Sequence, residues 1–114
     1  MNMEHLLPRV PDFPAITIHK NGAIVIHYLT VKRYDLMGVP FEILGFDRIT
    51  KILTIRPSMD ESDGSCKLSK HTSGALVISA KRFLDENNIP YSKRTRVFPV
   101  DWNPTKDCIE VKLN

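Results

Sequence analysis

Residues 16–26 read ITIHKNGAIVI, and residues 66–78 read CKLSKHTSGALVI. Each stretch has an alternating apolar segment, a lysine shortly before a glycine, and then a second short apolar segment. Alternation with period two is typical of a half-buried strand, and Asn21-Gly22 is a strong turn signal. Each stretch therefore predicts a β-hairpin, and their similarity predicts that the chain contains one unit twice.

The similarity continues through the sequence that follows each hairpin. A unit of this length buries its own apolar face poorly, so we expect the two units to share one core. With this matching, the second hairpin has an enlarged turn at residues 71–73. The matched landmarks are Lys20 with Lys70, residues 22–26 with 74–78, Lys32-Arg33-Tyr34 with Lys81-Arg82-Phe83, Val39-Pro40-Phe41 with Ile89-Pro90-Tyr91, and Thr50-Lys51 with Thr105-Lys106.

The chain divides into an arm, two repeats and a connector. Prolines interrupt residues 1–14, which we expect to form an N-terminal arm. The repeats cover residues 15–57 and 66–114, and the acidic, turn-forming segment 58–65 joins them as a loop. Each repeat predicts strand, turn, strand, helix, strand, turn and strand. The expected fold class is mostly β with short helices, and residues 15–114 are expected to form a single domain.

Each repeat also predicts where its helix begins and ends. The first helix is expected over residues 29–37, with Gly38 as its C-terminal stop. The second is expected over residues 80–87, with Ser79 as an N-cap and Asn88 in the left-handed conformation at its end.

Composition is ordinary for a soluble globular protein, with 42% apolar and 25% charged residues among 114. No apolar run approaches the roughly 20 residues that a membrane-spanning helix needs. The N-terminus lacks a basic segment followed by an apolar one, which a secretory signal would have. We therefore expect a cytoplasmic protein that does not enter a membrane.

The order of elements resembles the swapped-hairpin transcription factors of the AbrB, SpoVT and MraZ type. The residues that carry the resemblance are 16–26, Gly38-Val39, Asp47 and 53–57. The resemblance implies a pseudo-two-fold β-barrel of the swapped-hairpin or cradle-loop type, built from two tandem ββαββ repeats. It also implies a DNA-binding transcriptional regulator whose basic residues contact the duplex. This chain has Ala23 and Ala75 where the family usually has a basic residue.

Both repeats are mildly basic, which is compatible with a nucleic-acid partner. Residues 15–57 contain six Lys/Arg against three Asp/Glu, and residues 67–114 contain nine against five. The matched cations predict two symmetric clusters suited to phosphates of double-stranded DNA, although a Lys-Arg pair on a short helix is explained equally well as a solvated face. The expected nucleic-acid-binding residues are Lys20, Lys32, Arg33, Lys70, His71, Lys81 and Arg82.

Two further groups extend this interface. Lys93, Arg94 and Arg96 form a dense basic run in the second repeat only. Asn21 and residues 71–73 lie at the expected turn tips and are candidates for contacts to base edges.

Nothing in the sequence indicates catalysis, a metal or a cofactor. The histidines lack ligand spacing, and Cys66 and Cys108 are interpreted as reduced thiols in strands. Asp47 and Asp101 occupy related positions and are explained as turn-initiating aspartates. Trp102 is either a cap over the barrel end or an interface anchor, and packing favours the cap.

A second hypothesis remains open from the sequence. The chain would be a small non-enzymatic β-barrel that binds a protein or peptide through residues 1–14 or through an exposed strand edge. Both hypotheses allow either a monomer or an intertwined homodimer, because the two repeats can close on each other or exchange between chains.

Overall fold

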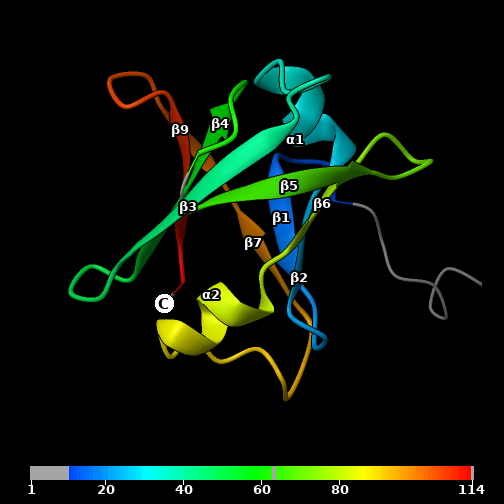
Figure 1. The fold of residues 1–114 in the computed structure, drawn as a ribbon. Coiled ribbons are helices and arrows are strands. Elements are labelled where there is room, and N and C mark those ends of the chain that lie inside the picture. Colours follow the sequence, from blue (N-terminus) through cyan, green and yellow to red (C-terminus); the bar gives the residue numbers. More distant parts are fainter. Residues whose placement is uncertain (1–10, 63, 114) are drawn as a thin grey trace, which may run out of the picture.

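The computed structural model describes residues 11–62 and 64–113 and contains nine strands and two short helices in this part of the chain. The strands form one antiparallel sheet that closes almost completely into a barrel (Figure 1). The elements are β1 (Ala15–Ile18), β2 (Ala23–Ile26), α1 (Tyr28–Arg33), β3 (Phe41–Asp47), β4 (Ile52–Ser58), β5 (Ser65–Lys70), β6 (Leu76–Ser79), α2 (Lys81–Glu86), β7 (Arg96–Pro99), β8 (Asp101–Asn103) and β9 (Cys108–Lys112). Neither helix is long and apolar enough to span a bilayer.

The strand order around the barrel is β7-β1-β2-β6-β5-β3-β4-β9-β8. The two edge strands, β7 and β8, follow one another in the chain and are separated only by Val100. The Val100 N–H donates to the carbonyl of Pro14 (3.1 Å), which holds this break beside the start of β1. Each repeat was expected to have one strand between its helix and its last turn. In the second half this is wrong, because the chain turns at Val100 and pairs with β1 before the break and with β9 after it.

The two halves of the chain complete each other's sheet. The first strand of each half pairs with the third strand of the other, β1 with β7 and β5 with β3. At the pairing of β2 with β6, Val25 lies opposite Val77. At the pairing of β4 with β9, Thr54 lies opposite Glu110. The hydrophobic pairs on either side are Ile24 with Ile78, Ile26 with Leu76, Leu53 with Val111, and Ile55 with Ile109.

The two hairpin turns have the same backbone hydrogen bonds. The His19 N–H donates to the Ala23 carbonyl (2.9 Å), and the His71 N–H donates to the Ala75 carbonyl (2.9 Å). The glycine three residues after each histidine donates back to it. His71 thus corresponds to His19, and the expected match of Lys20 with Lys70 and the enlarged second turn are wrong. The backbone hydrogen bonds of the turns decide which residues of the two hairpins correspond, and the spacing of the lysines does not reveal them.

Both helices are shorter than expected. α1 ends before Gly38, because Asp35 adopts a positive φ of 55° and the Leu36 N–H closes the helix on the Val31 carbonyl (2.8 Å). α2 has Ala80 rather than Ser79 at its N-cap, with no side-chain capping bond. The expected left-handed residue at its C-terminus is confirmed, since Asn88 has φ 57°.

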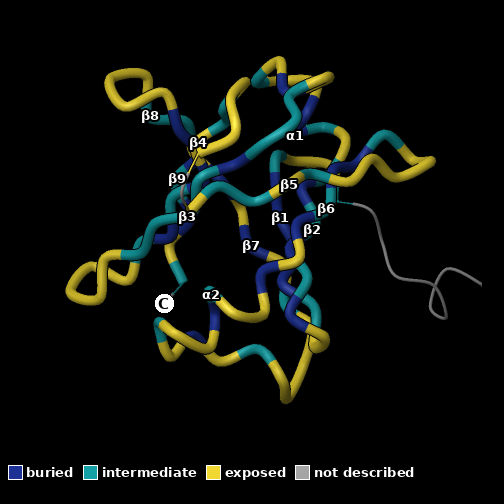
Figure 2. The backbone as a smooth tube through the Cα atoms, in the orientation of Figure 1, coloured by how far each residue is buried: buried dark blue, intermediate teal, exposed yellow. Residues whose placement is uncertain are grey.

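Mostly aliphatic side chains from both halves form the core of the barrel. Figure 2 shows that the buried residues lie along strands of both halves. Thr30, on α1, is fully buried, and its hydroxyl accepts from the Ala15 N–H (2.7 Å) and donates to the Ala15 carbonyl (2.9 Å). These bonds satisfy the polar groups where the helix meets β1. Trp102 stacks on Tyr34 with ring centroids 5.2 Å apart, and both pack against the core, in keeping with the expected cap.

Each hairpin tip lies against the first turn of the other half's helix. A Cβ added to Gly22 would lie 2.6 Å from the Lys81 Cβ and 2.8 Å from its Cα. A Cβ added to Gly74 would lie 2.5 Å from a ring carbon of Tyr28. Both glycines also have positive φ, 88° and 90°. Glycine is therefore required at both tips for two reasons: the opposite helix leaves no room for a Cβ, and the backbone has a positive φ.

We predict that Gly22→Ala destabilises the protein substantially more than Gly38→Ala. Both glycines have positive φ, so each alanine costs about 1–2 kcal/mol of backbone strain. At Gly38 nothing lies within 4 Å of the added Cβ, whereas at Gly22 the backbone of α2 must move, at a further cost of about 1–3 kcal/mol. Denaturant unfolding of the two variants measures the difference, and equal losses would contradict the contact between the tip and α2.

Candidate nucleic-acid interface

The seven cationic and histidine residues expected at the interface are all exposed, but the structure does not bring them together. Lys81 and Arg82 begin α2, close to the β1–β2 turn that carries Lys20. Lys32 and Arg33 occupy the last turn of α1. Figure 1 shows α1 and α2 at opposite ends of the barrel.

The last two, Lys70 and His71, lie where β5 runs into its turn. The following Gly74 contacts Tyr28, the first residue of α1. This turn is therefore at the α1 end, away from the turn that contacts α2.

The expected correspondence between the two helix cation pairs is wrong. Lys32 and Arg33 are in the last turn of α1, where cations interact favourably with the helix dipole. Lys81 and Arg82 are in the first turn of α2. Each helix begins two residues after the strand that precedes it, so the first residue of α1 corresponds to the first residue of α2. The similar Lys-Arg-aromatic sequences therefore lie at different positions in the two helices. The two symmetric cation clusters are not formed.

The structure instead gathers five cations at the α2 end, from the β1–β2 turn, α2 and the loop before β7. The Lys20 N–H donates to the Thr95 hydroxyl (3.2 Å), which places the turn tip beside that loop. Arg96 pairs with Ile18 on β1, next to the same turn. Gly22 rests on Lys81. We call this surface the basic end and define it by Lys20, Lys81, Lys93, Arg94 and Arg96.

Few carboxylates oppose the charge of the basic end. Residues 13–34 and 87–100 contain no Asp or Glu. In α2, the carboxylate of Asp85 accepts a bond from the Tyr91 hydroxyl (2.7 Å), and Glu86 pairs with Arg82 at 3.7 Å. That exposed pair is the only ion pair within residues 11–62 and 64–113, so the five cations have no carboxylate partner there.

One contact orients part of this surface. The Arg96 guanidinium lies over the ring of Phe98, with its central carbon 4.8 Å from the ring centroid. A cation–π contact of this kind holds an arginine in place while its outer N–H groups stay available. The sequence contained the signal for this surface in the run from Lys93 to Arg96, but only the fold places the run beside Lys20 and Lys81.

The residues expected to read base edges are partly used by their own turns. The side-chain oxygen of Asn21 accepts from the Ala23 N–H (2.9 Å). In the other turn, the His71 Nδ1 lies 2.9 Å from the Ser73 hydroxyl and accepts from the Ser73 N–H (3.1 Å). Thr72 is exposed at that tip. Asn21 alone among these residues lies at the basic end.

The described residues contain no group of three or more His, Cys, Asp or Glu side chains arranged to hold a metal ion. Cys66 and Cys108 are free thiols in β5 and β9, and burial raises the pKa of both. Asp47 and Asp101, which the sequence analysis matched, have different roles. Asp47 accepts from the Ile49 and Thr50 N–H groups, which lowers its pKa, and Asn103, not Asp101, has the corresponding role in the β8–β9 turn.

The sequence analysis missed one unusual ionisable residue, Glu42 in β3. Its side chain is fully buried, and neither carboxyl oxygen has a hydrogen-bond partner among the residues that the structure describes. Burial raises its pKa from 4.5 to about 8. Cys66 lies directly opposite on β5, and Pro57 lies opposite on β4. A glutamate in a short strand is usually taken as solvent-facing, so only the strand register places it inside the barrel.

Comparison with known proteins gives no assignment. The chain matches no protein-family model, no curated protein and no solved structure.

We predict that Glu42→Gln removes a fall in stability that the wild-type protein undergoes between about pH 4.5 and 8. Below pH 4.5 the carboxyl is protonated in both the folded and the unfolded chain. As the pH rises, the unfolded carboxyl ionises while the folded one keeps its proton. The free energy of unfolding therefore falls, by at most about 1.4 kcal/mol per pH unit, until the folded carboxyl also ionises.

The measurement is denaturant unfolding of both proteins at several pH values. Burial and the neighbouring His19 lower the pKa of His27, and the pH dependence that this causes is shared by both proteins, so their difference isolates Glu42. Glu42→Val should remove the same pH dependence and raise stability throughout, since it also removes two unpaired buried oxygens. Parallel pH profiles for wild type and Glu42→Gln would contradict the prediction.

Proposed function

We propose that this chain is a DNA-binding transcriptional regulator of the swapped-hairpin type, and that the basic end contacts the phosphates of a DNA duplex. The observation that carries the proposal is the gathering of Lys20, Lys81, Lys93, Arg94 and Arg96 on one surface without carboxylate partners in the described chain. Phosphate contacts supply most sequence-independent affinity for DNA. The proposal assigns no catalytic step and no cofactor to the chain.

The swapped-hairpin part of the proposal is supported by the strand registers. If residues 15–57 and 66–114 are repeats, an approximate two-fold axis exchanges them. Such an axis requires pairings between equivalent strands to be centred on equivalent residues. Val25 opposite Val77 in β2–β6 and Thr54 opposite Glu110 in β4–β9 meet this requirement. The axis also exchanges the β1–β7 pairing with the β5–β3 pairing in the strand order.

The proposed axis relates the backbones but not the charges. The equivalent of Lys20 is Thr72, because both follow the histidine that closes the turn. The equivalent of Lys81 is Tyr28, because each begins its helix and receives the other half's hairpin tip. The α1 end therefore lacks the matching cations, and we propose that one chain holds DNA by one end only. A monomer offers one such surface and a homodimer offers two.

A second candidate function has its own supporting observation. β7 is an edge strand of the described sheet, and its residue Val97 is 48% exposed. An edge strand offers unpaired backbone groups to an extended peptide. A peptide-binding module would use this edge. The arm version of this hypothesis concerns residues 1–14, of which 1–10 lie outside the described residues.

For DNA binding we predict that the triple variant Lys20→Gln, Lys93→Gln, Arg94→Gln binds duplex DNA at least tenfold more weakly than wild type at low salt. Each lysine or arginine that neutralises a phosphate releases counterions, so each loss also flattens the salt dependence of log K by about 0.9. Fluorescence anisotropy of a labelled mixed-sequence duplex, titrated at several salt concentrations, measures both effects.

A charge-matched control separates this interface from net charge. The variant Lys67→Gln, Lys106→Gln, Lys112→Gln removes three exposed cations from β5, the β8–β9 turn and β9. It should retain most of the affinity and salt slope. Equal losses in the two triple variants would refute the basic end as the interface, and no binding by wild type at low salt would refute DNA binding altogether.

A further inference from the structure

A pocket of about 330 Å³ lies at the C-terminal end of α2, away from the residues that begin this helix at the basic end. Its walls come from three places: the β3–β4 hairpin, the residues that follow α2, and the residue that follows β9. Ligand pockets usually measure about 300–1,000 Å³, so this one suits a small molecule.

The inner wall of the pocket is apolar and well anchored. Phe46, Ile89 and Leu113 line it and pack on the barrel core. The Ile89 N–H donates to the Leu84 carbonyl (2.9 Å), and the Leu113 N–H donates to the Lys51 carbonyl (3.0 Å). These bonds fix both sides of the wall to the body of the protein. The pocket is therefore preformed in the structure described.

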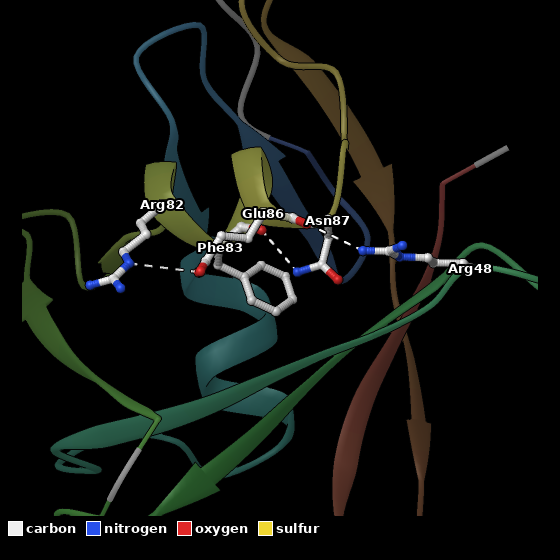
Figure 3. Close-up of polar contacts among 5 residues, drawn as sticks. All are labelled: Arg48, Arg82, Phe83, Glu86 and Asn87. Carbon is white, nitrogen blue, oxygen red and sulfur yellow. Dashed lines mark hydrogen bonds and ion pairs between the residues drawn. The ribbon is translucent and has the colours of Figure 1, made fainter.

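The rim of the pocket is polar and positively charged. Arg48 and Lys51 come from the β3–β4 turn, and Asn87 and Asn88 come from the end of α2. The side-chain N–H of Asn87 donates to the Phe83 carbonyl (2.9 Å), which turns its oxygen away from the helix (Figure 3). No Asp or Glu of the described chain lines the pocket. The two cations therefore meet no compensating charge within it.

One hydrogen bond orients Arg48 and leaves its other N–H groups free to bind a ligand. Its Nη2 donates to the backbone carbonyl of Glu86 (3.2 Å), the last residue of α2. Figure 3 shows Arg48 on one side of the helix end and Arg82 on the other. The Glu86 carboxylate pairs with Arg82 at 3.7 Å, so it does not neutralise Arg48. A guanidinium has five N–H donors, and one bond leaves the others for a ligand.

We propose that this pocket binds a small carboxylic acid with a short aliphatic or aromatic body. The carboxylate accepts bonds from Arg48 and Lys51, because a planar carboxylate matches the fork of a guanidinium. The apolar body lies against Phe46, Ile89 and Leu113. An inorganic anion would leave that wall unused, and an uncharged apolar molecule would leave both cations unpaired. The inference is independent of DNA binding, since the pocket and the basic end share no residue.

The test is a titration of the ¹⁵N-labelled full chain, followed by amide chemical shifts, with benzoate and hexanoate as probes. Saturable shifts are expected at Lys51, Asn88 and Leu113, up to probe concentrations of tens of millimolar. Benzamide and hexanamide have the same bodies without the charge, and inorganic phosphate has charge without a body. These three should leave the amides of the pocket unchanged.

Two variants test the cations individually. Arg48→Gln can still donate to the Glu86 carbonyl but has no charge, and Lys51→Gln has no charge at the second position. Each should weaken benzoate binding roughly tenfold, the loss typical of one charged hydrogen bond. Lys70→Gln removes an exposed cation from the end of β5, at the α1 end of the barrel, and should change nothing. The proposal is overturned if no saturable shift occurs, if benzamide or phosphate reproduces it, or if Arg48→Gln and Lys51→Gln bind benzoate as wild type does.

Discussion

The pairing of β2 with β6 is the interaction on which the rest of this structure depends. It joins residues fifty or more positions apart, and it places Ile24 opposite Ile78 and Ile26 opposite Leu76, all buried. The other pairings between the halves, β1 with β7 and β5 with β3, extend the sheet on either side of it. The chain must therefore close long loops before these hydrophobic pairs stabilise it, which makes the cross-half contacts decisive for the fold.

Local signals predicted most elements of this fold. The turns at Gly22 and Gly74, the left-handed Asn88 and the alternating strands follow from residues adjacent in sequence. The errors arose where a tertiary contact selects between local options. Asp35 takes the left-handed conformation although Gly38 suits it better, because ending the helix there lets Leu36 enter the core. The break at Val100 likewise depends on two different partner strands, which no local pattern reports.

The candidate site was predictable in kind but not in place. The sequence indicated that lysines and arginines form the site. Alignment of the two repeats by residue type, however, paired Lys32 with Lys81, which lie at opposite ends of their helices. A register defined by hydrogen bonds corrects this and brings Lys93, Arg94 and Arg96 beside Lys20. Glu42 escaped notice for the same reason, since its burial is a property of strand position and not of its neighbours in sequence.

The proposed duplication gives the two halves matching backbones but different side chains, and this difference would decide where binding surfaces arise. The contacts that maintain the proposed symmetry are glycines and buried aliphatic pairs, which tolerate little change. The halves differ at exposed positions of the hairpin tips and at the first residues of the helices: Lys20 corresponds to Thr72, and Lys81 to Tyr28. α2 then lies between the basic end at its first residue and a positively rimmed pocket at its last turn. The last turn of α1, with Lys32 and Arg33, has instead the basic residues that α2 lacks in its own last turn. Buried packing contacts thus keep the two halves of the barrel alike, while charged surface residues make its two ends different.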